Sequence, residues 1–234
     1  MERIKSGIKG FDELVQGGFP IGSTILVSGG SGTGKTIFGL TYLVAGAKLY
    51  KEPGIYISLE SNLQNIIWNV ESFGWDLKPL QEMNKLKIYR MNLHTQENVE
   101  MQIEEELKVI ASLVKEMGCK RLVVDSTTAL GVWIAEKGKI RNLLYSFAES
   151  LKGLGCTSML IAETRGRKND FNAFGVEDYV ADSVIAMYFV PPNRSIFVRK
   201  MRGTSHNATV HPFIITNSGI EVKPRDEILW EALK

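Results

Sequence analysis

Short apolar runs alternate along the chain with longer segments in which apolar residues recur at helical spacing. Strand-like runs lie at residues 24–28, 55–59, 86–90, 122–124 and 159–162, and helical spacing at about 36–50, 97–117 and 139–154. The runs at 122–124 and 159–162 have no polar face, which is typical of parallel strands covered on both sides. The pattern predicts an α/β fold with a mainly parallel central sheet flanked by helices.

The pattern changes after Asp182. Two strand-like runs, at 183–190 and 195–201, are joined by Pro191-Pro192-Asn193, which is a hairpin signal, and shorter runs follow at 213–216 and 219–222. We expect these segments to extend the sheet with antiparallel strands. The sequence shows no internal repeat, and residues 1–234 are expected to form one domain.

The composition narrows the function classes. Hydrophobic residues at 44% and charged residues at 23% argue against a disordered chain or a coiled coil. A formal net charge of +2 is too weak for a protein that binds duplex DNA chiefly by neutralising phosphates. Cys119 and Cys156 precede apolar runs and are predicted to be buried thiols. No segment reaches the roughly 18 apolar residues of a membrane span, so we expect a cytoplasmic protein with no membrane partner.

A glycine-rich segment between a predicted strand and a predicted helix carries the strongest chemical signal. Residues 29–36, GGSGTGKT, match G-x-x-x-x-G-K-[ST], a loop that turns successive backbone N–H groups toward phosphate. In this motif Lys35 reaches the β- and γ-phosphates and the Thr36 hydroxyl ligates Mg²⁺. The predicted phosphate-binding positions are Gly30, Ser31, Gly32, Thr33, Gly34, Lys35, Thr36 and Ile37.

Two acidic residues follow predicted strands that end at the same edge of the sheet. Asp125 closes the apolar run 122–124 and is predicted to hold Mg²⁺, although an acid at this place also caps turns. Glu60 follows the run 55–59, where a carboxylate is able to orient the attacking water. A helix cap or an ion pair is the structural alternative for Glu60.

Segments along nearly the whole chain resemble the KaiC-like branch of the RecA-type ATPases. The resemblance is carried, in the family's order, by residues 7–14 (GIKGFDEL), 17–18, the glycine-rich loop, 52–54 (EPG), 72–76 (SFGWD), 174–177 (FGVE) and 200–206 (KMRGTSH). It implies a RecA-like P-loop fold, ATP as the nucleotide and Mg²⁺ as the metal. It also implies a homohexameric ring with its active sites at subunit boundaries.

The resemblance further assigns roles to single residues. Glu60 matches the first of two catalytic glutamates, and the second is replaced here by Ser61. Glu163 matches a position near the γ-phosphate, with an ion pair as the alternative. Lys200 and Arg202 match residues that reach the neighbouring subunit's γ-phosphate, and His206 matches a phosphate or interface contact. The alternative for Lys200 and Arg202 is a solvated strand edge.

Three functions agree with these residues. The first is a Mg²⁺-dependent, ring-forming ATPase that regulates partner proteins the sequence does not identify. The second is a RadA-like recombinase whose loops, at 126–138 and 164–178, contact single-stranded DNA; the second loop holds Arg165, Arg167, Lys168, Phe171 and Phe174. The absence of a helix-hairpin-helix segment before the ATPase core disfavours it. The third is a scaffold that binds ATP with little turnover, which Glu60 disfavours.

Overall fold

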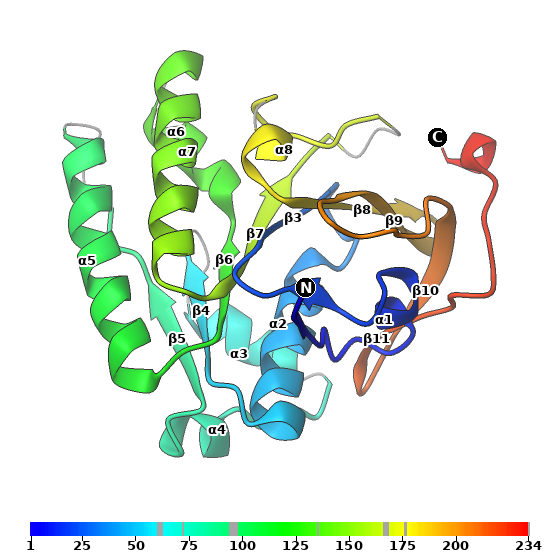
Figure 1. Ribbon diagram of the computed structural model, residues 1–234, viewed down its shortest axis with the longest axis horizontal. Helices are drawn as coiled ribbons and strands as arrows, with labels where there is room; N and C mark the ends of the chain where they lie inside the picture. Colours follow the sequence, from blue (N-terminus) through cyan, green and yellow to red (C-terminus); the bar gives the residue numbers. More distant parts are fainter. Residues whose placement is uncertain are drawn as a thin grey trace.

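The computed structural model describes residues 1–59, 63–71, 73–93, 98–134, 136–165, 169–175 and 177–233. In this part of the chain nine strands form one sheet with helices on both faces (Figure 1). The strand order is β11-β10-β9-β8-β3-β7-β6-β4-β5. The strands from β8 to β5 in this order are parallel, whereas β9, β10 and β11 are antiparallel. The predicted α/β architecture, with antiparallel strands near the C-terminus, is confirmed. The run 183–190, which was expected among the antiparallel strands, instead pairs in parallel with residues 25–29 and is antiparallel only to the strand that follows it.

The parallel strands coincide with the apolar runs of the sequence. They are β3 (Thr24–Gly29), β4 (Gly54–Ser58), β5 (Leu86–Arg90), β6 (Arg121–Asp125), β7 (Thr157–Glu163) and β8 (Ser183–Val190). The antiparallel strands are β9 (Asn193–Met201), β10 (Val210–Thr216) and β11 (Gly219–Val222). The carboxyl ends of the parallel strands meet at one edge, where α/β proteins place their ligands.

Helices divide between the two faces according to their apolar contacts. On one face lie α1 (Phe11–Leu14), α2 (Lys35–Ala45), α3 (Leu63–Glu71) and α4 (Lys78–Glu82). On the other lie α5 (Val99–Met117), α6 (Leu130–Trp133), α7 (Lys137–Gly153) and α8 (Glu177–Val180). A π-helical turn at Gly46–Tyr50 extends α2, and 3₁₀ turns lie at Thr127–Ala129 and Trp230–Ala232. Part of the loop predicted at 126–138 is therefore helical.

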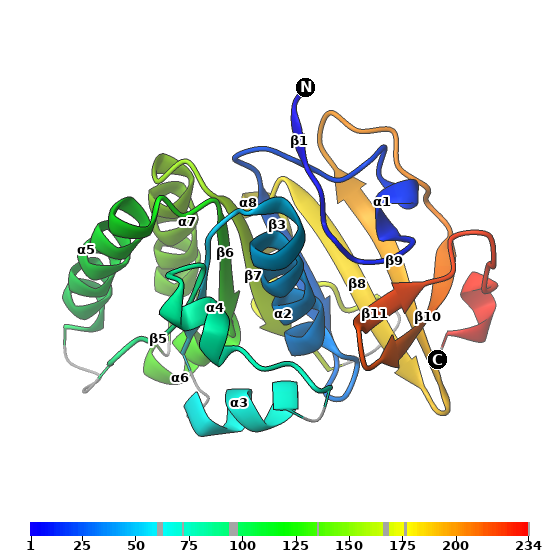
Figure 2. The ribbon, with the colours of Figure 1, turned by 90° about the horizontal axis from the view of Figure 1, so that it is seen from below.

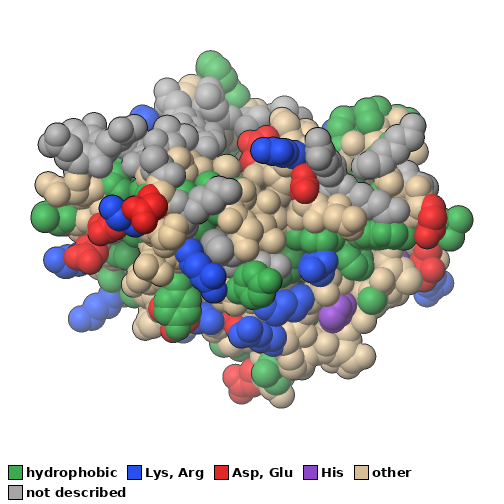
Figure 3. Space-filling model, turned by 90° about the horizontal axis from the view of Figure 1, so that it is seen from above, with side chains coloured by type: hydrophobic (Ala, Val, Ile, Leu, Met, Phe, Trp, Pro, Cys, Tyr) green, Lys and Arg blue, Asp and Glu red, His purple; other side chains and the backbone are tan. Residues whose placement is uncertain are grey.

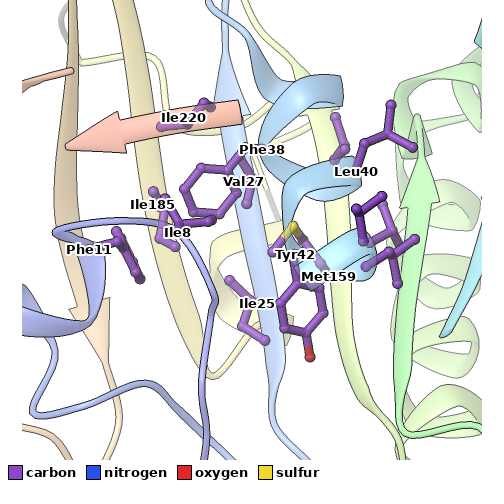
Figure 4. Close-up of a cluster of buried hydrophobic side chains, with 14 of the residues drawn as sticks. Ile8, Phe11, Ile25, Val27, Phe38, Leu40, Tyr42, Met159, Ile185 and Ile220 are labelled. Atoms are coloured by element: carbon purple, nitrogen blue, oxygen red, sulfur yellow. The ribbon is translucent and has the colours of Figure 1, made fainter. Parts of the chain in front are cut away.

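The core between α2 and the sheet fixes the first strand and its helix relative to each other. Ile25 and Val27 of β3 pack toward Phe38 of α2, whereas Leu26 packs on the opposite face (Figure 4). A Cβ on Gly39 of α2 would lie 2.8 Å from a methyl carbon of Val123, so glycine lets the helix approach the sheet closely. This packing holds the loop between β3 and α2 at the carboxyl edge.

The N-terminal segment forms structure that the sequence pattern did not predict. β1 (Arg3–Ile4) and β2 (Phe19–Pro20) make a separate two-stranded sheet. Arg3 donates hydrogen bonds to the carbonyl of Gly18 at 2.9 Å and to the Thr204 hydroxyl at 2.9 Å. Strands of two residues carry too little periodicity to be found from sequence.

An arginine is buried at the amino ends of the parallel strands, opposite to the glycine-rich loop. Arg121 begins β6 with no exposed surface, and its guanidinium donates to Glu52 at 2.7 Å and to the Tyr42 carbonyl at 2.8 Å. The guanidinium also lies 4.5 Å from the centre of the Tyr42 ring. This network joins the segment before β4 to α2 and β6.

Two further observations concern the expectations from composition. Cys119 and Cys156 are buried and not in a disulfide, as predicted. Among the residues described, no helix combines the length and the apolar character needed to cross a membrane.

Candidate functional site

The glycine-rich loop connects the carboxyl end of β3 to the first turn of α2. Gly32 and Gly34 adopt positive φ angles of 74° and 100°, backbone conformations that residues other than glycine rarely adopt. A Cβ on Gly29 would lie 2.3 Å from the Met187 carbonyl oxygen. Lys35 donates a hydrogen bond to the carbonyl of Gly30 at 2.8 Å. The loop thus places a lysine and the N-terminus of a helix around one concave surface, which is suited to phosphate.

Asp125 and Thr36 meet beside this loop. The Thr36 hydroxyl donates to Asp125 Oδ2 at 2.7 Å, and the Tyr56 hydroxyl donates to the same oxygen at 2.5 Å. Burial, and then the neighbouring Asp125 charge, raise the pKa of Tyr56 well above its ordinary value. The sequence analysis predicted the Thr36 and Asp125 positions and missed Tyr56, because a tyrosine in an apolar strand resembles any other core residue.

A cavity of about 570 Å³ lies over the loop. Its lining comprises Ser31, Gly32, Gly34, Lys35, Thr36, Ile37, Asp125, Ser126, Glu163, Arg194 and Ile215. The structure therefore brings six of the eight predicted loop residues together with Asp125 and Glu163. Gly30 and Thr33 do not line the cavity; Thr33 is buried, and its hydroxyl donates to the Gly30 carbonyl at 2.9 Å. Glu163 ends β7 directly opposite Gly29 of β3, and its side chain is exposed.

Arg194 is a cavity residue that the sequence analysis missed. It is the second residue of β9, donates a hydrogen bond to the Gly32 carbonyl at 3.2 Å, and stacks its guanidinium 4.2 Å from the centre of the Phe189 ring. The β8–β9 hairpin carries this pair against the glycine-rich loop. No local motif marks Arg194, because its place depends on how the hairpin folds back onto β3.

The oxygen atoms in the cavity fit Mg²⁺. A hydroxyl and a carboxylate lie within one hydrogen bond of each other at the helix N-terminus, and Mg²⁺ prefers one or two protein oxygens together with water and phosphate oxygens. Within the described ranges no cluster of three His, Cys, Asp or Glu side chains forms an all-protein metal cage. Thr36 and Asp125 would hold the ion, which would neutralise charge on the phosphates.

Lys200, Arg202 and His206 lie at the other end of the sheet. Ile25, near the start of β3, pairs with Ser183 of β8, and Ser183 in turn pairs with Met201 of β9. Figure 2 shows the connection after β9, in orange, at the end of the sheet opposite to the β8–β9 hairpin. The cavity therefore does not contain these three residues of the same chain.

Local contacts hold these side chains in place. Lys200 donates to the Ala181 carbonyl at 2.7 Å, and Arg202, 60% exposed, lies 3.4 Å from Asp182 Oδ1. His206 donates through Nδ1 to the Thr204 carbonyl at 3.4 Å. Figure 3 shows several Lys and Arg side chains close to a histidine in the lower half of the view.

Part of the predicted site lies outside the described residues. Glu60, Ser61, Arg167 and Lys168 belong to this part, so their predicted roles are not tested. β4, which precedes Glu60, ends at Ser58, and Ser58 pairs with Asp125 at the cavity edge.

Phe171 and Phe174, the two aromatic residues of the loop that the recombinase alternative assigns to single-stranded DNA, pack against the protein. Phe171 is buried, and the centre of its ring lies 6.4 Å from the centre of the Phe197 ring. The Arg199 guanidinium lies 4.0 Å from the centre of the Phe171 ring. Phe174 is half-buried, and a Cβ on Gly131 would lie 2.4 Å from its ring. Base stacking on the pair, as the recombinase interpretation requires, is therefore not supported.

Together, the fold and the site define a class of protein. A glycine-rich loop between a central parallel strand and a helix, with an acidic residue at the end of a nearby strand, is the arrangement of P-loop nucleotide-binding proteins.

Comparison with known proteins identifies the family. A family model described as "ATPase: KaiC" matches residues 4–227. A UPF0273 protein of Pyrococcus horikoshii is 36% identical over 241 residues, which cover 97% of this chain and 96% of that protein. The circadian clock oscillator protein KaiC of Parathermosynechococcus lividus is 34% identical over 228 residues, which cover 94% of this chain and 42% of that protein. The chain therefore belongs to the KaiC family of ATPases, a nucleotide-binding family, and the resemblance seen in the sequence is confirmed.

A solved structure agrees with this assignment. The crystal structure of a KaiC-like protein from the archaeon Pyrococcus horikoshii OT3 matches with a TM-score of 0.85 and 36% sequence identity. The match covers 95% of this chain and 99% of that chain. The RecA-like fold predicted for the chain is thus also the fold of a relative of similar length.

Proposed function

We propose that this protein is a Mg²⁺-dependent ATPase whose active sites form between neighbouring copies of the chain in a homohexameric ring. One copy binds the triphosphate with Lys35, Thr36 and Asp125. The next copy supplies Lys200 and Arg202 to the γ-phosphate. The observation that carries the proposal is the separation of these two sets of residues. The phosphate-binding set lies at the carboxyl end of β3, whereas Lys200 and Arg202 lie toward its amino end.

Distance explains why two copies are needed. β3 has six residues, and at ~3.3 Å per residue its ends are about 16 Å apart, farther than a lysine or arginine side chain extends. In a head-to-tail ring the same two surfaces of successive copies face each other. A guanidinium supplied across that boundary stabilises the charge that develops on the γ-phosphoryl oxygens, and such residues are worth roughly 10³–10⁵ in rate.

Water activation is assigned to Glu60. In this role the Glu60 carboxylate would orient water and accept its proton, while Lys35, together with Mg²⁺ held by Thr36 and Asp125, would neutralise the phosphates. Arg194 and Ile215 line the cavity beside the loop and are assigned to the remainder of the nucleotide. The output of hydrolysis is proposed to be regulatory, through changes in ring contacts with partner proteins.

The test is the Glu60→Gln variant. We expect it to bind ATP as the unchanged protein does, while hydrolysis, measured as phosphate release, falls by at least 10²-fold because the water loses its base. Gln keeps the size and hydrogen-bonding capacity of Glu, so a folding defect is not expected. If Glu60→Gln hydrolyses ATP as fast as the protein without the substitution, Glu60 is not the base. If the protein without the substitution binds ATP but does not hydrolyse it, an ATP-sensing scaffold is favoured.

A further inference from the structure

Tyr56 lies in the middle of β4, where its ring belongs to the core between the sheet and α2. Its side chain is 1% exposed. Tyr56 pairs with Val123 of β6, so Asp125 is two residues farther along the neighbouring strand, toward the carboxyl edge. The Tyr56 ring thus spans from the core to the base of the cavity, and its hydroxyl ends on the Asp125 carboxylate.

Two hydroxyl groups from different elements donate to one oxygen of Asp125. Tyr56 approaches from β4 at 2.5 Å and Thr36 from α2 at 2.7 Å. A carboxylate with a single donor is able to rotate about its Cβ–Cγ bond. Donors on two elements restrict that rotation, and hydrogen bonds to an ionised group are stronger than those between neutral groups.

Two other tyrosine hydroxyls form their hydrogen bonds away from the cavity. Tyr42 donates to the Thr157 carbonyl at 3.3 Å, and Tyr89 donates to Glu106 at 2.7 Å. Neither residue lines the cavity. Phenylalanine would fill the same core volume at position 56, so packing alone does not account for the Tyr56 hydroxyl.

We propose that Tyr56 is a positioning residue for the Mg²⁺ site: its buried hydroxyl fixes the orientation in which Asp125 meets the metal. The inference rests on the proposed function, because it requires that the cavity bind a Mg²⁺–nucleotide complex. Groups that orient a metal ligand through one hydrogen bond change metal affinity by roughly 10–100-fold when they are removed.

The experiment compares Tyr56→Phe with the unchanged protein in equilibrium binding of an ATP analogue that has nitrogen between its β- and γ-phosphates. Affinity is measured with EDTA and again with saturating Mg²⁺. With EDTA we expect equal affinities, because the phosphate loop is unaltered. The gain in affinity on adding Mg²⁺ should be about 10-fold smaller in Tyr56→Phe.

The matched control is Tyr89→Phe, which removes a hydroxyl from a comparable tyrosine–carboxylate pair away from the cavity. It should keep the full Mg²⁺-dependent gain. In an Asp125→Asn background, Tyr56→Phe should have no additional effect on that gain, because the two residues act as one unit. A merely structural role for Tyr56 would lower affinity equally with and without Mg²⁺.

Three results overturn the inference, and the third of them overturns the proposed function as well. An equal Mg²⁺-dependent gain in Tyr56→Phe and the unchanged protein contradicts it, as does an effect of Tyr56→Phe that persists with Asp125→Asn. An unchanged protein with no Mg²⁺-dependent nucleotide binding overturns the proposed function itself, and this inference with it.

Discussion

Lys35→Ala and Arg202→Ala remove the two halves of the proposed shared site, so mixing the variants tests whether the halves come from different copies. Lys35 lies at the carboxyl end of β3, and Arg202 lies beyond its amino end. The turnover of each variant alone should fall by roughly 10³-fold or more, which is the contribution that arginines supplied in trans make in other phosphoryl-transfer enzymes.

The magnitude of recovery follows from the head-to-tail geometry. In rings assembled at random from equal amounts of the variants, half of the copies carry an intact phosphate loop and half of their neighbours carry an intact Arg202. About one boundary in four is then complete, and the mixture should recover about a quarter of the unchanged turnover per chain. If both groups served one chain's own site, no intact site would exist in any mixture.

Phosphate release at several mixing ratios is the assay, with light scattering to verify that rings form. Lys35→Ala mixed with Asp125→Asn is the matched control. Both changes affect the same cavity of one chain, as the contact of Thr36 with Asp125 indicates, so no recovery is expected. Intact rings of Lys35→Ala and Arg202→Ala that stay inactive at every ratio would refute the shared site.

Three further predictions address stability and binding. Glu52→Ala should lower the free energy of unfolding by about 3 kcal/mol in urea denaturation, because Arg121 is left buried without its counter-charge; a loss below about 1 kcal/mol would contradict this. Arg194→Ala should weaken nucleotide binding by roughly 10-fold in a titration, and equal affinity would place the nucleotide away from Phe189. Burial, and then the hydrogen bond to Glu106, raise the pKa of Tyr89 to about 12, above its value in the unfolded chain. The stabilising contribution of Tyr89 is therefore present below about pH 10 and is lost as the pH rises toward 12. Tyr89→Phe should therefore lose less stability over that interval, and parallel pH profiles for the two proteins would contradict the assignment.

The sequence predicted the parts of the site that strand ends position. The carboxyl ends of parallel strands share one edge, so Asp125 was expected beside the glycine-rich loop, and the family resemblance added Glu163; both line the cavity. The pattern of apolar runs also identified β5, although its residues are less buried than those of β6. Local patterns are sufficient where a residue's place follows from its strand.

Other residues depend on contacts between segments that are distant in the sequence. Arg194 reaches the loop only because the β8–β9 hairpin folds against it, and Tyr56 meets Asp125 across two strands. Glu52 and Arg121 are similar: residues 52–54 stood out in the sequence only as a segment of the family resemblance, whereas the structure shows Glu52 as the partner of a buried arginine. Such pairs carry no signal in either segment alone.

The most direct test of the shared site is the turnover per chain, measured together with the mass of the assembly, across a dilution series in Mg²⁺ and ATP. The account predicts that turnover falls in proportion as the assemblies dissociate, and that isolated chains still bind nucleotide. Full turnover by chains whose measured mass is that of a single copy would contradict it.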